Sequence, residues 1–256
     1  MRITKADIKR FRSLKQRKFR EEERLFVAEG RKCVTSLFDR FREGYVVVRT
    51  GAEAIEVPQG MQLLEASSQE MEQLSQLQAP PDVLGVFAIP ADDWKEEEML
   101  RLAGHELVLV LDEIQDPGNL GTIIRTADWF GVRHIVCSHT TADVYNLKVV
   151  QATMGSLARV NVHYADIESF VRKAKEQSIL VYGTLLDGTN IYSSRLTNYG
   201  VLVMGNEGRG ISEAVRRCVT SSLRIPSFPK GVPTAESLNV SVATAVVLAE
   251  FRRPLR

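Results

Sequence analysis

A polar loop follows an apolar run at residues 106–111 (ELVLVL), and it carries Asp112, Asp116 and Asn119. Pro117-Gly118 predicts a turn, and Asn119 would then cap a helix over residues 120–130. Arg125 lies six residues after Asn119, about 120° round such a helix. A capped surface helix accounts for Asn119 alone. Carboxylate and amide groups gathered at the end of a strand indicate a binding or catalytic loop.

A second loop carries three closely spaced glycines after an apolar run at residues 200–204: Gly205, Gly208 and Gly210. Their G-x-x-G-x-G spacing lets the backbone approach a ligand closely. It differs from the G-x-G-x-x-G of dinucleotide binding, which disfavours a nicotinamide-dependent oxidoreductase. A purely structural turn remains an alternative, although Glu207 and Arg209 between the glycines favour a site.

A third polar group stands at the start of a helix predicted over residues 238–252, whose first eleven residues are almost all apolar or small. Ser237 is a natural N-cap for this helix. Asn239 and Ser241 have no such role, and unpartnered polar groups in a buried helix cost about 1–3 kcal/mol each. We therefore expect them to face a ligand or another chain.

The elements that must position these loops alternate between short apolar strands and helices. This pattern predicts an α/β fold with a mostly parallel sheet covered on both faces, with ligands beyond the carboxyl ends of its strands. A smaller α/β unit precedes it, and the charged segment 91–104 predicts a boundary near residue 95. The expected strands are 45–49, 84–89, 106–111, 133–137, 178–183, 200–204 and 222–225; the expected helices are 29–42, 69–76, 120–130, 146–155, 211–218 and 238–252.

Charge is distributed unevenly along the 256 residues, although 33 Lys and Arg nearly balance 32 Asp and Glu. Residues 1–32 hold twelve basic and five acidic residues, a local net charge of +7 that leaves −6 for the rest. Apolar Ile8, Phe11, Leu14 and Phe19 are spaced as on one face of a helix. The segment predicts a basic amphipathic helix, either a solvated surface helix or an element that contacts nucleic-acid phosphates. The candidate phosphate contacts are Lys9, Arg10, Arg12, Lys15, Arg17 and Lys18.

Other classes of protein are disfavoured by what the sequence lacks. No apolar stretch approaches the roughly 20 residues of a membrane-spanning helix, and no secretory signal is recognisable, so we expect a cytoplasmic protein. The cysteines Cys33, Cys137 and Cys218 lie far apart, and the four histidines have no metal-ligand spacing. We therefore expect neither a disulfide framework nor a metal site.

The three loops together resemble the motifs of the SpoU (TrmH-like) branch of the SPOUT RNA methyltransferases. The resemblance covers about residues 106–253 and rests on LDEIQDPGNLGTIIRTADWFGV, VLVMGNEGRGIS and IP…ESLNVSVATAV. Residues 1–90 more weakly resemble a substrate-binding domain related to a ribosomal protein. The resemblance implies an RNA substrate-binding domain at residues 1–95 and a methyltransferase domain with a deep trefoil knot at residues 96–256. It also implies a homodimer that transfers a methyl group from S-adenosylmethionine to a ribose 2′-hydroxyl of rRNA or tRNA.

Site residues follow from the resemblance by position in the motifs. The implied catalytic residues are Asn119, Arg125, Glu207, Ser237 and Asn239. The implied cofactor-binding residues are Thr184, Leu185, Met204, Gly205, Asn206, Gly208, Ile225, Pro226 and Leu238. Arg209 joins the basic residues of the first segment as a candidate RNA contact.

Direct methyl displacement requires an aligned 2′-oxygen and stabilisation of the developing oxyanion. A guanidinium stays protonated in proteins, so our hypothesis gives Arg125 the role of binding phosphate or stabilising the oxyanion. Asn119 would hold Arg125, Glu207 and Asn239 would orient it, and Arg125 would act within one subunit or across the dimer. A catalytically silent RNA-binding dimer and a tRNA substrate remain alternatives; the N-terminal segment favours rRNA.

Overall fold

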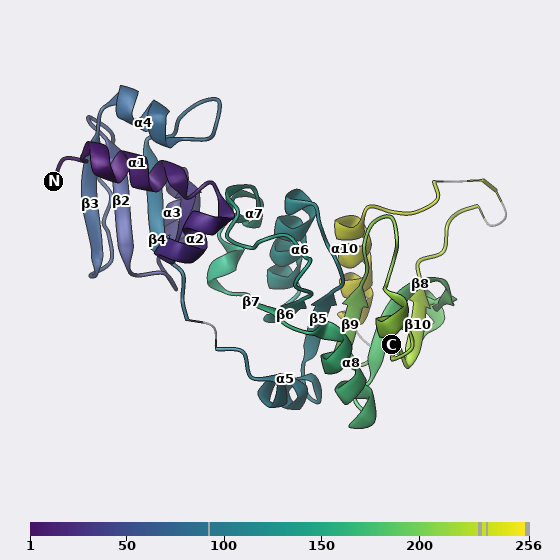
Figure 1. Ribbon diagram of the computed structural model, residues 1–256. Coiled ribbons are helices and arrows are strands. Elements are labelled where there is room, and N and C mark those ends of the chain that lie inside the picture. The colour runs from purple at the N-terminus through teal and green to yellow at the C-terminus, as the bar shows by residue number, and fades with distance from the viewer. Residues whose placement is uncertain (92, 230–231, 234, 254–256) are drawn as a thin grey trace. The chain divides into compact units, whose positions relative to one another are not determined.

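The structure is a computed structural model that describes residues 1–91, 93–229, 232–233 and 235–253 (Figure 1). Its contacts divide the chain into two units, each with its own sheet. Unit 1 comprises residues 1–91 and 143–159, and unit 2 comprises residues 92–142 and 160–256.

Unit 1 is built on a four-stranded sheet in the order β1-β4-β2-β3. The strands are β1 (Leu25–Glu29), β2 (Gly44–Arg49), β3 (Met61–Ala66) and β4 (Val83–Ala88). β4 pairs antiparallel with both β1 and β2, and β2 pairs parallel with β3. The strands at 45–49 and 84–89 were predicted from their apolar runs, whereas β1 and β3 were not.

The basic segment forms two helices, α1 (Lys5–Ser13) and α2 (Arg17–Glu23), rather than the single helix that its spacing predicts. A capping box between Thr4 and Asp7 starts α1. The predicted apolar face is confirmed for Ile8, Phe11 and Leu14, which are buried. The chain turns after Leu14, whose carbonyl oxygen accepts a 2.7 Å hydrogen bond from Arg20.

Two layers cover the sheet of unit 1. α1 and α4 (Ser68–Leu74) contribute Phe11 and Met71 to one buried cluster with the strands. α3 (Arg31–Leu37) lies against the other face, where Val34 approaches Gly85 of β4.

A segment from the middle of the chain completes unit 1. α7 (Leu147–Thr153) and the short 3-10 helix η1 (Ser156–Ala158) pack with β1 and α3. Gln151 donates a 2.8 Å hydrogen bond to the backbone oxygen of Glu29. Arg20, only 4% exposed, forms a 2.5 Å ion pair with Asp143. The compact unit therefore uses residues that lie more than 50 positions beyond its first segment.

Unit 2 contains a six-stranded sheet in the order β10-β8-β9-β5-β6-β7, and every pair in it is parallel. This confirms the predicted α/β class with a parallel sheet. The strands are β5 (Leu107–Leu111), β6 (His134–Cys137), β7 (Asn161–Tyr164), β8 (Val181–Asn190), β9 (Gly200–Met204) and β10 (Ser221–Arg224).

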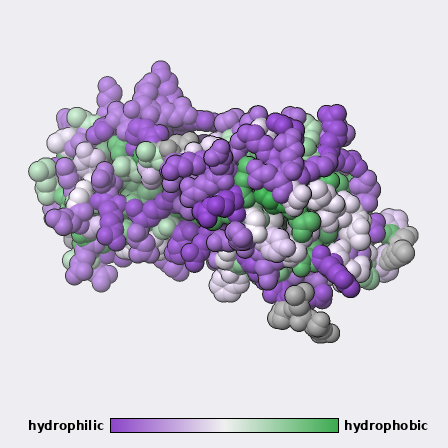
Figure 2. Space-filling view, turned by 90° about the horizontal axis from the view of Figure 1, so that it is seen from below, coloured by the Kyte–Doolittle hydropathy of each residue, from purple (hydrophilic) through white to green (hydrophobic). Residues whose placement is uncertain are grey.

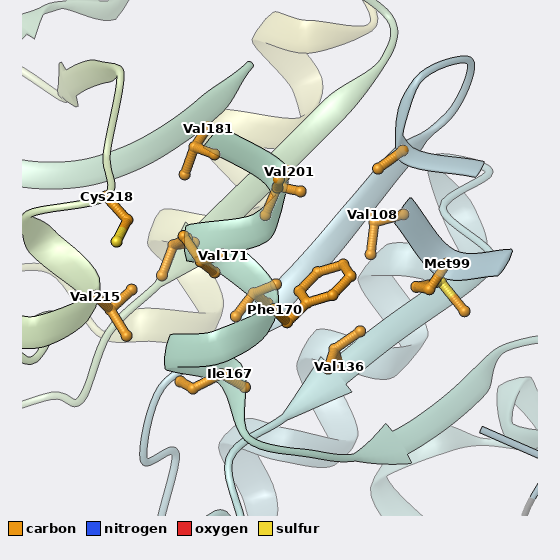
Figure 3. Close-up of a cluster of buried hydrophobic side chains, with 14 of the residues drawn as sticks. Met99, Val108, Val136, Ile167, Phe170, Val171, Val181, Val201, Val215 and Cys218 are labelled. Carbon is orange, nitrogen blue, oxygen red and sulfur yellow. The ribbon is translucent and has the colours of Figure 1, made fainter. Parts of the chain in front are cut away.

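Helices cover both faces of this sheet. α5 (Glu96–Ala103), α8 (Ile167–Glu176) and α9 (Glu213–Arg216) share one buried cluster with the strands. Figure 3 shows Phe170 of α8 at its centre, beside Val108 and Val136. α10 (Val240–Phe251) lies on the opposite face, where the rings of Phe251 and Tyr182 meet edge to face with their centroids 4.9 Å apart. α6 (Pro117–Trp129) packs beside α10. A second 3-10 helix, η2 (Ile191–Ser193), follows β8.

Hydrophilic residues occupy most of the face drawn in Figure 2, and hydrophobic ones form small separate groups. Among the helices that the structure describes, none is long and apolar enough to cross a membrane. Within the same residues, no group of three or more His, Cys, Asp or Glu side chains is arranged to hold a metal ion.

Candidate active site at the ends of β5 and β9

The first two polar loops leave neighbouring parallel strands, because Leu111 at the end of β5 pairs with Met204 at the end of β9. Their side chains then connect the loops directly. Asp112, 3% exposed, accepts a 2.7 Å hydrogen bond from the backbone N–H of Ser212. Asn206 donates a 2.8 Å hydrogen bond to the carbonyl oxygen of Glu113. The sequence therefore places both loops at the same edge of the sheet, as parallel strands require.

Asn119 connects all three polar motifs. Its side-chain nitrogen donates to Glu207 Oε1 at 2.8 Å, and its side-chain oxygen accepts from Asn239 Nδ2 at 2.9 Å. Three of the five implied catalytic residues thus form one hydrogen-bonded row, although they lie 88 and 120 positions apart in the chain.

The N-cap of α6 is Asp116, not Asn119 as the sequence pattern predicts. Asp116 accepts a 2.7 Å hydrogen bond from the backbone N–H of Asn119, and Pro117 occupies the first helical position. Because Asp116 performs the capping, the side-chain amide of Asn119 is available to Glu207 and Asn239. The predicted end of this helix is confirmed, since Gly131 follows it with φ +66°.

The N-cap of α10 is Asn239, not the predicted Ser237. Asn239 Oδ1 accepts from the backbone N–H of Ser241 at 2.9 Å and from the Ser241 hydroxyl at 2.6 Å. The polar groups at the start of this helix therefore satisfy one another, and the nitrogen of Asn239 remains for Asn119. Ser237 is exposed and lies before the helix. The helix is also not buried on every side, because Val242 in its first turn is 51% exposed.

Arg125 lies on the exposed side of α6, apart from the hydrogen-bonded row. Within the described residues its side chain forms no hydrogen bond or ion pair. Asn119, Glu207 and Asn239 therefore do not hold Arg125 in this structure of the single chain. Exposed Thr122 and Trp129 lie on the same face of the helix, three residues before Arg125 and four after it.

The glycine-rich loop after β9 is closed by its own backbone. Asn206 and Gly210 exchange two 2.9 Å backbone hydrogen bonds, and the side-chain oxygen of Asn206 accepts from the N–H groups of Gly208 and Arg209. A Cβ at Gly205 would lie 2.3 Å from the carbonyl carbon of Gly210. The glycine is therefore required for this tight turn, which presents Glu207 to Asn119.

Glu113 is a site residue that the sequence reasoning did not single out. Its carboxylate forms an ion pair with Arg209, one of the candidate RNA contacts. Its backbone has φ +59°, a left-handed conformation that is uncommon for a residue other than glycine. Strained residues of this kind gather at functional sites, but a positive φ leaves no signal in a glutamate's sequence context.

Most of the implied cofactor residues lie within β8 or at the carboxyl ends of β9 and β10. Thr184 continues β8 and donates a 3.4 Å hydrogen bond to the carbonyl oxygen of Val203. Met204 and Gly205 are buried at the end of β9, while Ile225 and Pro226 follow β10 and are partly exposed. Leu238, 51% exposed, precedes α10. The nine implied residues include no charged side chain, which fits an adenine ring recognised by apolar contacts and backbone groups.

The basic residues of unit 1 lie in three places. Lys9, Arg10 and Arg12 are on α1, Lys15 is in the turn after it, and Arg17 and Lys18 begin α2. Arg10 pairs with Glu23 at 2.6 Å, and its hydrogen bond to this carboxylate raises the pKa of the guanidinium.

Comparison with known proteins agrees with this geometry. Residues 106–249 match the SpoU rRNA Methylase family, and residues 5–85 match the MRM3-like substrate binding domain. The 23S rRNA (guanosine(2553)-2′-O)-methyltransferase RlmP of Bacillus subtilis is 32% identical over 194 residues, which cover 75% of this chain and 73% of that protein. A putative RNA methyltransferase of the TrmH family from Porphyromonas gingivalis has a similar structure, with a TM-score of 0.88, 37% identity and 99% of each chain covered. The AdoMet-bound rRNA methyltransferase of Sinorhizobium meliloti gives a TM-score of 0.82 at 31% identity, over 98% of this chain and 95% of that one.

Proposed function

Because the chain belongs to the SpoU rRNA methylase family, we propose that it transfers a methyl group from S-adenosylmethionine to a ribose 2′-hydroxyl of ribosomal RNA. The observation that carries this proposal is the row Glu207–Asn119–Asn239, which joins the three family motifs at one edge of the sheet. Similarity to an enzyme named for 23S rRNA supports rRNA over tRNA. The match of residues 5–85 to a substrate-binding domain supports an RNA-binding role for residues 1–95 and a methyl-transfer role for residues 96–256.

S-adenosylmethionine supplies an electrophilic methyl group on a sulfonium. We assign its binding to the backbone and apolar side chains within β8 and at the ends of β9 and β10, together with Leu238. Glu207, Asn119 and Asn239 fix the positions of the loops around the reacting oxygen. The 2′-oxygen would bond to the methyl carbon as the bond from that carbon to sulfur breaks, and the hydroxyl proton would pass to water. The protonated guanidinium of Arg125 would bind the substrate phosphate or stabilise the developing oxyanion. Ser237 lies before the cap residue Asn239 and completes the proposed catalytic set.

A homodimer is part of the same proposal, with the trefoil knot and the cytoplasmic location that the resemblance implies. Trp129 on α6 is 85% exposed, and the adjacent helix α10 exposes Val242 by 51%. Tryptophan is enriched at protein interfaces, so the exposure of Trp129 supports contact with a second copy at this end of α6. A second copy covering this face would bury Trp129 and bring Arg125, which is on the same side of α6, to the subunit boundary.

The direct test is incubation of the protein with methyl-labelled S-adenosylmethionine and either purified rRNA or purified tRNA. We expect label in rRNA at a single ribose. Label in tRNA alone would contradict the rRNA assignment. Cofactor binding without label in either RNA would favour the silent RNA-binding dimer.

A further inference from the structure

A groove of about 450 Å³ lies between α1 and α4 on unit 1. Its polar lining consists largely of Arg12, Lys15, Gln69, Glu72, Gln73 and Gln76. Below it, Phe11 and Leu14 from the α1 side pack with Met71 and Leu74 from α4 in the core. The volume falls within the range of about 300–1,000 Å³ found for small-ligand sites, so it is large enough for one nucleotide.

The basic residues of this region divide into two groups by their partners. Three cations are paired with carboxylates of α2. Arg17 pairs with Glu21 at 2.7 Å, and Lys18 pairs with Glu22 at 3.7 Å. Arg10 of α1 pairs with Glu23. Lys9, Arg12 and Lys15 form no ion pair with any residue that the structure describes, and of these three only Arg12 and Lys15 line the groove. A phosphate in the groove can therefore bind these two cations without breaking an existing ion pair.

The opposite wall is rich in amides. Gln69 and Gln73 are four residues apart on α4, and Gln76 follows the helix. All three are exposed, and within the described chain their side-chain amides have no hydrogen-bond partner. Amide side chains offer a donor and an acceptor together, which is the arrangement that pairs with the edge of a base.

The end of this wall is held in place by a buried carboxylate. Glu29, 2% exposed, accepts a 2.5 Å hydrogen bond from the Ser75 hydroxyl and a 2.9 Å bond from the backbone N–H of Gln76. The groove is therefore preorganised, and a ligand would not have to order the loop after α4.

We propose that this groove binds one unpaired nucleotide of the RNA substrate, with its phosphate at Arg12 and Lys15 and its base against Gln69, Gln73 and Gln76. The inference rests on the proposed function and names the part of the RNA that unit 1 contacts. Unpaired nucleotides expose the base edges that RNA-binding proteins read. Glu72 contributes one negative charge to the lining and weakens phosphate binding.

The test compares equilibrium binding of rRNA over a series of salt concentrations. Arg12→Ala/Lys15→Ala should weaken binding about tenfold or more and reduce the salt slope by about 0.7, the contribution of one neutralised phosphate of a single strand. Gln69→Ala/Gln73→Ala should weaken binding without changing the slope. Glu72→Gln should strengthen it. The matched control Arg101→Ala/Arg133→Ala removes two exposed cations of unit 2 that form no ion pair with a described residue, and it should change affinity less than twofold.

Methyl transfer and cofactor affinity are measured on the same proteins, so that failure of the proposed function can be distinguished from failure of the groove. If the wild-type chain neither binds nor methylates rRNA, the proposed function and the groove fail together. If the wild-type chain is active but Arg12→Ala/Lys15→Ala loses no more affinity than the control pair, the groove alone is excluded. The thermal unfolding of each variant should match that of the wild type, since the changed side chains are exposed.

Discussion

The side-chain amide of Asn239 donates to the side-chain oxygen of Asn119 at 2.9 Å, between the first turns of two neighbouring helices. Each asparagine uses its other amide atom elsewhere: Asn119 donates to Glu207, and Asn239 caps α10. The positions of α6, α10 and the glycine-rich loop are therefore coupled through two side chains.

Replacing Asn119 with aspartate should disrupt the row while preserving its shape. Asn119→Asp still accepts from Asn239, but it loses the donor to Glu207 and places two carboxylates side by side. We expect kcat/KM for methyl transfer to fall at least about tenfold, equivalent to roughly 1.4 kcal/mol. Asn119→Gln serves as the neutral control. Unchanged activity in Asn119→Asp would show that the Glu207 contact is not used.

Arg125 should contribute to turnover but not to stability. Arg125→Ala removes an exposed side chain without a partner among the described residues, so the unfolding temperature should stay within about 2 °C of the wild type. Activity should fall about 100-fold or more if the guanidinium stabilises the oxyanion. Arg125→Lys should keep weak activity with an unchanged pH profile. A profile that follows a new titrating group would refute the electrostatic role.

Mixed dimers decide whether Arg125 acts across the proposed interface. Arg125→Ala and Asn119→Ala dimers should each retain little activity alone. If Arg125 acts across the interface, mixing them would create one intact shared site in every mixed dimer. Random exchange should then restore about a quarter of wild-type activity. Recovery of no activity would place Arg125 and Asn119 of the same subunit in one site.

Trp129 should be required for dimerisation. Trp129→Glu replaces the exposed indole of α6 with a charge and should shift the protein to a monomer in light scattering, whereas Trp129→Phe should remain dimeric. Both variants should keep the same circular dichroism spectrum, since Trp129 is 85% exposed in the single chain. A dimer that survives Trp129→Glu would move the interface elsewhere.

His134 should make stability depend on pH. Its Nδ1 is buried with no hydrogen-bond partner among the residues that the structure describes. Burial lowers its pKa more than the nearby carboxylates of Glu106, Glu98 and Asp93 raise it. The unfolded chain therefore binds a proton more readily than the folded one. Its contribution to stability should be complete above about pH 6.5, the ordinary histidine value, and should decrease as the pH falls. Urea unfolding at pH 7.5 and 5.5 should show a smaller difference for His134→Gln.

The ion pair between Arg20 and Asp143 should be essential to unit 1. Asp143→Ala leaves the guanidinium of Arg20 buried without its charge partner, and this should cost about 3–5 kcal/mol of unfolding free energy. Arg20→Met/Asp143→Ala removes both charges and should recover part of the loss. Equal destabilisation in the single and double variants would contradict a buried, unpaired charge as the cause of the loss.

The parallel sheet and the three site loops could be predicted because apolar runs and polar strand ends leave clear patterns. The caps were wrong for a physical reason: Asp116 and Asn119 are both good N-caps, and only the position of Glu207, distant in sequence, decides between them. Ser237 and Asn239 are likewise both good N-caps, and Asn239 performs the capping of α10. α8 could have been found, since Ile167, Phe170, Val171 and Ala174 have helical spacing after the cap Asp166.

Other features depend on contacts that no local pattern contains. β3 (MQLLEA) is an edge strand whose burial does not alternate, so its sequence shows no period of two. The break between α1 and α2 follows from the buried Arg20, whose partner Asp143 lies 123 residues away. The basic residues of this segment could be predicted as a group, but their division into paired and unpaired cations required the positions of Glu21, Glu22 and Glu23.

The inclusion of α7 in unit 1 also constrains the order in which the chain matures during synthesis. Translation delivers the N-terminus first, but Asp143 and Gln151 leave the ribosome only after β5, α6 and β6 have already emerged. The first unit therefore cannot reach its final packing as a nascent N-terminal fragment, and an isolated piece ending near residue 95 would lack the partner of Arg20. The two units are joined in their biogenesis as well as along the chain.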